Sequence, residues 1–430
     1  MDIDLAVGRY RGATAPRGAV KRDAAVEDGS FMSAIIGPRR AGKTTFMLQL
    51  MDGLPLPASN KVFVNGEDVA FEGMTADDLP KIEEAVFRLY RPDPTKDLRL
   101  FIDEVQRFPS WARWVRTLHD SGKYGVMVTG STSELSTDRL PSVLRGRALN
   151  TLVLPFSFAE LLRAKGAEAE GLTSPEKAGA LASFADEYVE FGGYPAVVLA
   201  EGAQLKHRIL QELFDTVVQR DMIERLKVRS LPLLRAFVSA VLGSACRPLS
   251  ARSISRWLGA EGLKLGRQTA LSYLDGAEDV FMIKRAYPFS KKPKERRVSP
   301  KVYALDSGFL ALVGGDSSKK LENQVFVDLV RRGGALSYWR SQTTGKEVDF
   351  VVGGRRPELV QAAWSVADPA TYDREVGALK EAAGELGAER LTVVTSKEEK
   401  VFREGGREVE VVPAWKWFLR PGAPREGAKA

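Results

Sequence analysis

The sequence predicts an α/β fold whose N-terminal part is a mostly parallel sheet with helices on both faces. Three observations lead to this prediction. Short apolar strands alternate with helical segments between residues 33 and 154. A glycine-rich segment, residues 37–44, lies between the first strand, 33–36, and a helical segment that starts at Thr45. A later apolar strand, 98–102, ends in two acidic residues.

Residues 37–44 fit the pattern G-x-x-x-x-G-K-[ST]. Glycines let a backbone fold tightly round an anion, so that its N–H groups point inward. We therefore expect Lys43 to reach the β- and γ-phosphates of ATP and Thr44 to ligate Mg²⁺. The predicted nucleotide-binding residues of this segment are Gly37, Pro38, Arg39, Arg40, Ala41, Gly42, Lys43, Thr44 and Thr45.

A second strand and a helix separate the glycine-rich segment from two acidic residues. Residues 61–64 read as a second strand, and Thr75 with Asp78 has the spacing of a capping box at the start of a helix to about residue 90. Strand 98–102 then leads into Asp103 and Glu104. We expect Asp103 to hold Mg²⁺ and Glu104 to orient and deprotonate the attacking water. A solvated acidic turn is the alternative interpretation.

Two later positions are predicted to complete the site. The buried strand 126–131 carries Thr129, which resembles the sensor position of AAA+ ATPases and would touch the γ-phosphate, although turn chemistry also explains it. Arg147 precedes the fifth strand, 149–154. It resembles an arginine finger that enters a neighbour's active site, which would make hydrolysis depend on oligomerisation. A solvated or locally paired arginine is the alternative.

The middle of the chain is predicted to be helical and then to form a winged helix-turn-helix. Between helices stands Phe-Gly-Gly-Tyr-Pro, 191–195, where Pro195 would pack on the adenine or the turn would simply cap a helix. Three helices and paired strands follow, and we expect the third helix to enter a major groove. The wing would meet phosphates. The predicted DNA-binding residues are Arg267, Gln268, Lys291, Lys292, Lys294, Arg296 and Arg297. A solvated loop in a protein-binding domain is the alternative.

The last part of the chain is predicted to be a smaller α/β unit. Glu322, Asp349 and Gln361 approach the pattern E…D…(E/Q)-x-K, in which acids hold Mg²⁺ and a lysine steadies the nucleophilic water. Ala363 occupies the lysine position. We therefore expect a degenerate nuclease site in a fold kept for DNA or partner binding.

Composition restricts the chemistry and the partners. The chain has 430 residues, a net charge of +7, two histidines and one cysteine. Zinc sites and histidine-based triads are therefore disfavoured, and catalysis must use carboxylates, lysine, arginine and Mg²⁺. The absence of a disulfide framework, signal peptide and apolar span favours a cytoplasmic protein without membrane segments. The basic balance permits a polyanionic partner.

The order of these motifs resembles a prokaryotic, archaeal-ATPase-like family of AAA+-type ATPases with a C-terminal domain of unknown function. The resemblance runs from about residue 20 to residue 415 and includes 37–44, 101–106, 129–131, 144–158, 192–195, Glu322 and 347–350. It implies an AAA+ P-loop fold, a helical lid, a winged helix and a restriction-endonuclease-like domain. The expected divisions are 1–158 for the ATPase core, 159–228 for the lid, 229–312 for the winged helix-turn-helix, 313–420 for the nuclease-like domain and 421–430 for a tail.

Three functions remain open at this point. The first is a Mg²⁺-dependent ATPase that binds and acts on DNA as a homo-oligomer, of which a hexamer is one form. The second is a nucleotide-dependent signalling switch that gates assembly with a protein partner, which the turn at 193–195 favours. The third is a Mg²⁺-dependent nuclease, which the missing lysine disfavours.

Overall fold

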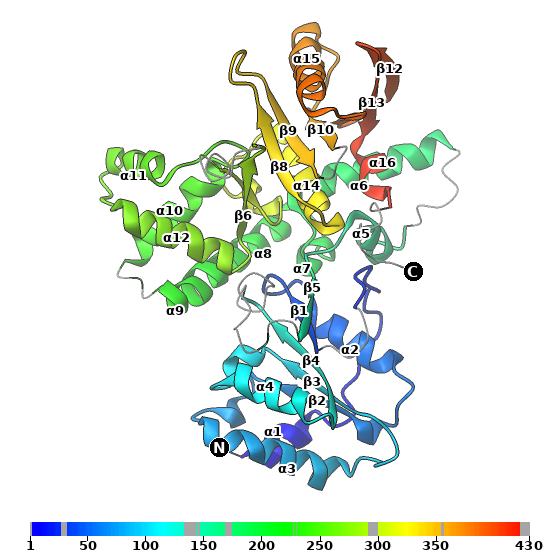
Figure 1. The fold of residues 1–430 in the computed structure, drawn as a ribbon, viewed down its shortest axis with the longest axis vertical. Helices are drawn as coiled ribbons and strands as arrows, with labels where there is room; N and C mark the ends of the chain where they lie inside the picture. The colour runs from blue at the N-terminus through cyan, green and yellow to red at the C-terminus, as the bar shows by residue number, and fades with distance from the viewer. Residues whose placement is uncertain are drawn as a thin grey trace. The chain divides into compact units, whose positions relative to one another are not determined.

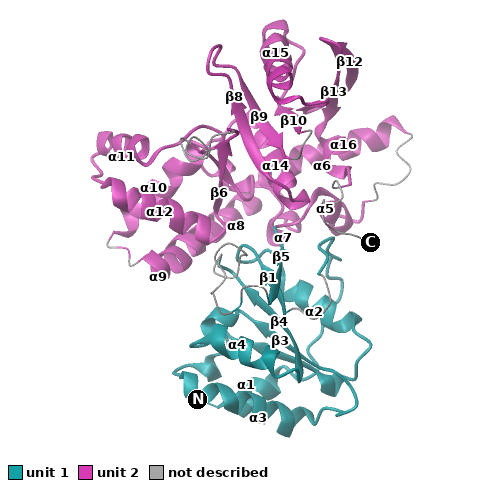
Figure 2. Cartoon of the chain, in the orientation of Figure 1, with its two compact units in different colours: residues 1–154 teal, residues 155–430 magenta. Residues whose placement is uncertain are grey.

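The computed structural model describes residues 2–26, 32–132, 144, 147–167, 174–226, 228, 230–290, 300–353 and 357–421. The chain divides into two compact units, unit 1 (residues 1–154) and unit 2 (residues 155–430), which Figure 2 colours separately. Among the described residues, no helix combines the length and the apolar character needed to span a bilayer.

Unit 1 contains a parallel sheet of five described strands in the order β2-β3-β4-β1-β5 (Figure 1). The strands are β1 (Met32–Ile36), β2 (Lys61–Asn65), β3 (Leu98–Asp103), β4 (Tyr124–Gly130) and β5 (Ala148–Leu152). All five residues of β1 are buried, as expected for a parallel strand that is covered on both faces. The predicted α/β fold with a parallel sheet is confirmed here.

Helices pack on this sheet through apolar side chains. The described helices are α1 (Ile3–Arg9), α2 (Lys43–Gly53), α3 (Leu79–Tyr90) and α4 (Trp111–Asp120). Phe46 and Met47 of α2 join Ile35, Phe63 and Phe101 of the strands in one buried cluster. The Thr75–Asp78 capping box forms, and it starts a short 3-10 turn (Ala76–Asp78) that leads into α3. Further 3-10 turns span Ala58–Asn60, Val69–Phe71 and Val105–Arg107.

Unit 2 begins with a largely helical region. Its described helices are α5 (Phe158–Ala164), α6 (Pro175–Phe191), α7 (Pro195–Val198), α8 (Ala203–Thr216), α9 (Ile223–Leu226), α10 (Leu231–Gly243), α11 (Ala251–Ala260) and α12 (Arg267–Asp279). A π-helical segment, Val217–Met222, joins α8 to α9. Ser230 and Ser250 accept hydrogen bonds from backbone N–H groups in the first turns of α10 and α11, so both serines act as N-caps.

The rest of unit 2 is built round a sheet of eight described strands, in the order β12-β13-β11-β10-β9-β8-β6-β7. These are β6 (Ile283–Pro288), β7 (Lys301–Ala304), β8 (Leu336–Arg340), β9 (Glu347–Val352), β10 (Glu358–Ala362), β11 (Arg390–Thr395), β12 (Lys400–Glu404) and β13 (Arg407–Pro413). The accompanying helices are α13 (Gly308–Ala311), α14 (Ser317–Arg332), α15 (Pro369–Leu386) and α16 (Ala414–Leu419).

The connection between the helical region and this sheet differs from the prediction in one respect. Strand β6 pairs with β7 antiparallel, as expected for a hairpin, but it also pairs with β8 in parallel through Tyr287 and Pro288. Residues on both sides of the predicted boundary at 312 therefore share one sheet. The strand expected at 280–283 begins only at Ile283, as β6, because α12 runs to Asp279 and Phe281 adopts a left-handed φ of 57°.

Candidate functional site

The glycine-rich loop closes tightly between β1 and α2. Gly37 has a φ of 149°, and a Cβ atom there would lie 2.0 Å from the carbonyl oxygen of Val153. Gly42 has a φ of 94°, and Arg40 is also left-handed with a φ of 61°. Gly42 is the N-cap residue of α2 and the helix has no side-chain cap, so its first N–H groups remain directed toward the loop. Such a loop and helix start form an anion-binding concavity.

Lys43 is the first residue of α2, and only 4 % of it is exposed. Its Nζ donates to the carbonyl oxygen of Pro38 at 3.1 Å and lies 3.7 Å from Oε1 of Glu104. Burial lowers the pKa of this ammonium group, while the charges of Glu104 and Asp103 oppose the shift. The lysine therefore folds back into the loop.

Asp103 ends β3 beside two hydroxyl groups. The hydroxyl of Thr44 donates to Oδ2 of Asp103 at 2.8 Å, and the hydroxyl of Thr129 donates to Oδ1. Burial raises the pKa of Asp103, and these two hydrogen bonds act in the opposite direction. Because β3 and β4 are neighbouring parallel strands, their carboxyl ends bring Asp103 and Thr129 together.

Glu104 follows in a left-handed conformation with a φ of 48°. Its N–H donates to the hydroxyl of Thr129 at 3.0 Å, and its Oε2 accepts from Gln106 and from Ser131. Burial by itself raises the pKa of Glu104, but the charge of Lys43 and these hydrogen bonds lower it overall. The carboxylate is thus an ionised group beside the loop lysine.

The residues at this site fit a magnesium ion in the donors that they offer. Thr44 and Asp103 supply a hydroxyl and a carboxylate oxygen at 2.8 Å from each other, and Mg²⁺ prefers oxygen ligands. Mg²⁺ usually keeps several waters and takes only one or two carboxylates from the protein. Of the other predicted loop residues, Arg39 forms an ion pair with Glu67, 3.2 Å from Nη2 to Oε1, and Thr45 is half-buried.

Arg22 also lies at the loop, although no sequence pattern singles it out. Its Nη1 donates to the carbonyl oxygen of Ala41 at 2.7 Å, and its Nη2 donates to that of Leu154. A Cβ atom on Gly42 would lie 3.1 Å from Nη1. Arg22 therefore links the loop to the last residue of unit 1. The arginine and Leu154 are 132 positions apart, which is why local patterns miss this contact.

Arg147 and Pro195 are two further residues predicted at the nucleotide site. Nε of Arg147 donates to Oδ1 of Asp120 at 3.1 Å within unit 1, and its side chain is 38 % exposed. Pro195 opens α7 in unit 2, and Gly192 caps the preceding helix α6 with a φ of 74°. The helix cap is therefore observed, whereas the finger and the adenine contact stay predictions.

The turn at 192–195 is held by an aspartate that sequence analysis missed. Oδ2 of Asp306 accepts from the N–H of Gly193 at 2.8 Å, and Oδ1 accepts from the N–H of Gly308 at 2.9 Å. A Cβ atom on Gly192 would lie 1.8 Å from Oδ1 of Asp306. Only glycine therefore fits this position without a rearrangement.

The predicted DNA-binding residues are described in part. Arg267 and Gln268 are exposed in the first turn of α12, which packs against α11. Helices α10 to α12 and the β6–β7 pair are the elements expected of a winged helix, but that assignment stays a prediction. The basic run lies outside the described residues, and it consists of Lys291, Lys292, Lys294, Arg296 and Arg297.

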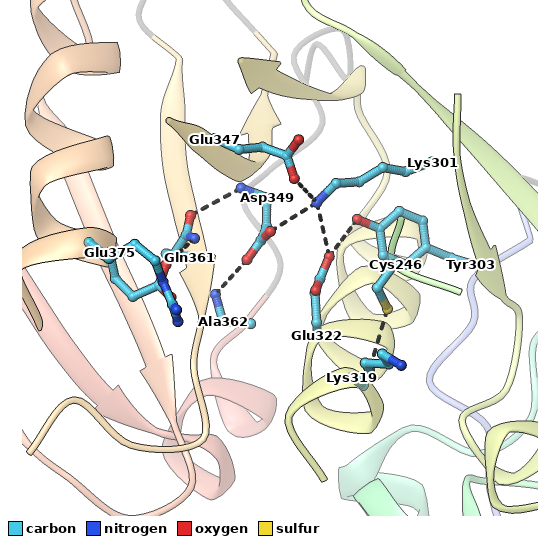
Figure 3. Close-up of polar contacts among 11 residues, drawn as sticks. Cys246, Lys301, Tyr303, Lys319, Glu322, Glu347, Asp349, Gln361, Ala362 and Glu375 are labelled. Atoms are coloured by element: carbon cyan, nitrogen blue, oxygen red, sulfur yellow. Dashed lines mark hydrogen bonds and ion pairs between the residues drawn. The ribbon is translucent and has the colours of Figure 1, made fainter. Parts of the chain in front are cut away.

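The acidic residues predicted in the C-terminal region come together round a lysine (Figure 3). Nζ of Lys301 lies 3.2 Å from Glu322, 3.0 Å from Asp349 and 2.8 Å from Glu347. The backbone N–H of Asp349 donates to Oε1 of Gln361 at 3.0 Å. The cluster thus contains Glu322, Asp349 and Gln361 as predicted.

Lys301, on β7, was not expected in this cluster. Only 1 % of its side chain is exposed, and the charges of Tyr303, Asp349, Glu322 and Glu347 outweigh burial and raise its pKa. Burial and the charge of Asp349 raise the pKa of Glu322 to about 8. Among the described residues, no group of three or more acidic, histidine or cysteine side chains is arranged to hold a metal ion. The lysine beside Glu322 and Asp349 is therefore Lys301 of β7, whereas position 363 is an alanine.

The fold and the loop geometry define unit 1 as a P-loop domain of the kind found in nucleoside triphosphatases. Residues 30–162 match a family described as an AAA domain, and residues 184–320 match a domain of unknown function, DUF8612.

Relatives cover most of the chain. It is 29 % identical over 400 residues to the uncharacterised protein MJ1544 of Methanocaldococcus jannaschii, covering 90 % of this chain and 88 % of that protein. It is 27 % identical over 333 residues to an uncharacterised protein of Haemophilus influenzae, covering 76 % and 80 % respectively. The Walker-type ATPase PABY2304 of Pyrococcus abyssi is similar in structure, with a TM-score of 0.43, 16 % identity and coverage of 66 % of this chain and 90 % of that one.

Proposed function

We propose that this chain is a magnesium-dependent, ATP-hydrolysing AAA+-type protein that acts on DNA. The observation that carries the proposal is the convergence of Lys43, Thr44, Asp103 and Glu104 at the phosphate loop, with Lys43 and Glu104 3.7 Å apart. A buried ammonium, a hydroxyl–carboxylate pair and a second, ionised carboxylate are the groups that phosphoryl transfer to water requires. The family match of residues 30–162 supports the same conclusion.

Each group has a separate role in this proposal. The loop N–H groups and Lys43 bind the phosphates, while Thr44 and Asp103 hold Mg²⁺. When bound, the ion neutralises charge on the phosphates. Glu104 orients the attacking water and accepts its proton, and its lowered pKa keeps it ionised for that purpose at neutral pH. Thr129 positions both acids, because it donates to Asp103 and accepts from the N–H of Glu104.

The sharpest test separates binding from hydrolysis at Glu104. Glu104→Gln keeps the size of the side chain and removes the base, so we expect ATP turnover to fall by about 100-fold or more while labelled ATP is still retained. Lys43→Ala should lose retention itself, because the phosphates then lack their ammonium partner. Turnover and nucleotide retention are measured on both variants with magnesium. Glu83→Gln, whose carboxylate accepts a hydrogen bond from the hydroxyl of Tyr124, is a matched control.

The DNA part of the proposal rests on the charge of the chain and on unit 2. The net charge is +7, and Arg267 and Gln268 are exposed at the start of α12. Turnover with and without duplex, forked or four-way DNA tests it, at low and at moderate salt. If the protein binds no DNA at low salt, the proposed action on DNA is rejected and the proposed ATPase activity is unaffected.

A second function, the nucleotide-dependent switch, is favoured by the way in which Glu104 is held. Its Oε2 already accepts hydrogen bonds from Gln106 and Ser131, and Arg147 is hydrogen-bonded to Asp120. When the proposed base and the proposed finger are both engaged in hydrogen bonds within their own chain, we expect ATP turnover to be slow. The switch predicts tightly retained ADP, slow turnover and no effect of DNA, and the turnover experiment distinguishes the two functions directly.

A third function, a magnesium-dependent nuclease, is less well supported. Lys301 ion-pairs with all three carboxylates of the cluster, so its ammonium already compensates part of the charge that a cation would neutralise. We therefore propose that this region is a degenerate nuclease-like fold that binds DNA or a partner. DNA cleavage that depends on magnesium and is abolished by Asp349→Ala would reverse this choice.

A further inference from the structure

Helix α11 carries an exposed tryptophan that the proposed function does not use. Trp257 is 51 % exposed, whereas Ala251, Ile254 and Leu258 of the same helix are buried. Of the other six tryptophans in the chain, five are buried and Trp364 is half-buried. The apolar face of α11 is therefore satisfied by packing within the unit, and Trp257 lies outside it.

Basic side chains surround this tryptophan on the helix. Arg252 and Arg256 are one turn apart, Arg256 is adjacent to Trp257, and all three are exposed. Residues 247–268 contain five basic side chains and a single acidic one, Glu261. Within the described part of the chain, neither Arg252 nor Arg256 forms an ion pair with a carboxylate. We call Arg252, Arg256 and Trp257 the α11 face.

The neighbouring helix extends the same chemistry. Helix α11 packs against α12, whose first turn exposes Arg267 and Gln268, and Lys264 is exposed in the connection between them. Helices α10, α11 and α12 form one group in Figure 1, with α11 at its outer edge. The α11 face thus adds an aromatic ring to a surface that is otherwise positively charged.

An exposed aromatic ring beside arginines that pair with no carboxylate of the described residues matches one ligand chemistry in particular. Single-stranded nucleic acid offers both phosphates and open base faces, and bases stack on aromatic side chains without regard to sequence. In an intact duplex each base face is already covered by its neighbours, so a ring on the protein surface has nothing to stack on. Phosphate contacts alone would require the arginines but not the tryptophan.

We propose that the α11 face binds single-stranded DNA, with Trp257 stacked on an unpaired base and Arg252 and Arg256 at the flanking phosphates. This inference rests on the proposed DNA-binding function and names its substrate class. DNA with unpaired stretches, such as a fork or a single-stranded tail, is then preferred to a blunt duplex of equal length.

The test uses the full chain and a fluorescein-labelled 20-nucleotide oligo-dT, with a blunt 20-base-pair duplex as the comparison. Trp257→Ala should weaken binding of the oligonucleotide about tenfold and Trp257→Phe should restore most of it, because stacking needs a ring. Arg252→Ala with Arg256→Ala should reduce the salt dependence by about 0.7 in logarithmic slope for each phosphate that the variant no longer neutralises. Phe87→Ala, an aromatic of 48 % exposure in unit 1, is the matched control.

Tryptophan fluorescence supplies a second readout that a purely structural role would not change. The wild-type signal should be quenched by oligo-dT, and the quenching should disappear in Trp257→Phe, because the other tryptophans are buried or half-buried. Thermal melting of each variant checks that it is folded.

Each other outcome overturns the inference. Equal binding by Trp257→Ala and wild type, or a preference for duplex, overturns it and leaves the proposed DNA-binding function standing. A change in oligomer size without a change in DNA binding assigns the face to protein contact instead. If the wild type binds no DNA of any form at low salt, both proposals fall together.

Discussion

The carboxylate of Glu104 is held from both of its oxygen atoms. Oε1 lies 3.7 Å from Nζ of Lys43, while Oε2 accepts from Gln106 and from Ser131 at 3.0 Å. Gln106 is only two positions further along the chain and lies in the 3-10 turn Val105–Arg107. The proposed catalytic base is therefore held by partners from three places in the chain, and we propose Gln106, the nearest of them in sequence, as a positioning residue for it.

Gln106→Ala should raise the basal ATP turnover. Loss of its hydrogen bond frees one lone pair of Glu104 and raises the basicity of the carboxylate, so we expect an increase of about threefold to tenfold in kcat. KM for ATP should stay near the wild-type value because Gln106 contacts Glu104 and not the loop. Gln49→Ala removes a glutamine that contacts backbone carbonyls in the same unit and serves as the control. A fall in kcat would show that Gln106 holds the base in its working position instead.

Asp306 is a second residue whose buried surroundings change its pKa. Burial raises its pKa to about 7, against the hydrogen bonds from Gly193 and Gly308 and the charge of Arg331. A carboxyl group whose pKa is higher in the folded than in the unfolded state binds its proton more tightly when folded. Its contribution to stability is therefore complete below about pH 4 and is lost as the pH rises through about 7.

Asp306→Asn should remove this pH dependence. We expect the free energy of unfolding of the wild type, relative to the variant, to decrease from pH 5 to pH 8 by roughly 2.5 kcal/mol. Urea unfolding of both proteins at several pH values measures the difference. If the free energies of unfolding of the two proteins change with pH in the same way, Asp306 does not titrate in this range.

At the scale of elements, Lys301 connects three separate parts of unit 2. Its ammonium on β7 contacts Glu322 of α14 and both Glu347 and Asp349 of β9. Nζ also lies 5.6 Å from the ring centre of Tyr338 on β8. A buried cation shared by several elements stabilises their arrangement only while all charges are compensated.

Lys301→Met should destabilise unit 2 strongly. Three acidic side chains would then lie together without a cation, and removal of one partner from a buried ion pair typically costs about 3–5 kcal/mol. Urea unfolding measures the change, and Lys346→Met, whose side chain is 41 % exposed, should change stability by less than about 1 kcal/mol. Addition of Glu322→Gln to Lys301→Met should recover part of the loss. A variant as stable as wild type would contradict an essential role for this lysine.

At the scale of the whole molecule, the predicted arginine finger makes ATP hydrolysis depend on a neighbouring copy of the chain. Arg147 is hydrogen-bonded to Asp120 of its own unit, yet its side chain is 38 % exposed. An arginine finger acts on the site of the next subunit, so each site would contain residues from two chains. Such an interface is heterologous and closes into a ring when the rotation permits.

Mixing two inactive variants tests this directly. Arg147→Ala keeps its own base and lacks the finger, whereas Glu104→Gln lacks the base and keeps the finger. We expect each alone to have little turnover, and an equal mixture to recover activity at roughly a quarter of the sites, where each variant supplies what the other lacks. Asp120→Ala, which only releases Arg147, should remain active. If the mixture stays inactive while both variants assemble, the finger is elsewhere or absent.

Much of unit 1 follows from sequence patterns alone. The five strands, the loop at 37–44 and the acids that end β3 are predictable because each depends on neighbouring residues. Helix α1, strand β12 and helix α16 are missed. Of the two paired strands expected at 280–283 and 301–305, the second is found at Lys301–Ala304, but the first begins only at Ile283 because α12 extends to Asp279.

What the sequence by itself determined is the phosphate loop, with its lysine, its threonine and the pair of acids, together with the α/β order of the strands around them. Their spacing along the chain is the spacing that the chemistry needs, so local patterns suffice. Only the tertiary structure decided that Arg22 joins the loop and that Lys301 enters the cluster of Glu322 and Asp349. Those contacts depend on which strands and segments become neighbours in space. They join residues 19 to 48 positions apart, so no local repeat in the sequence indicates them.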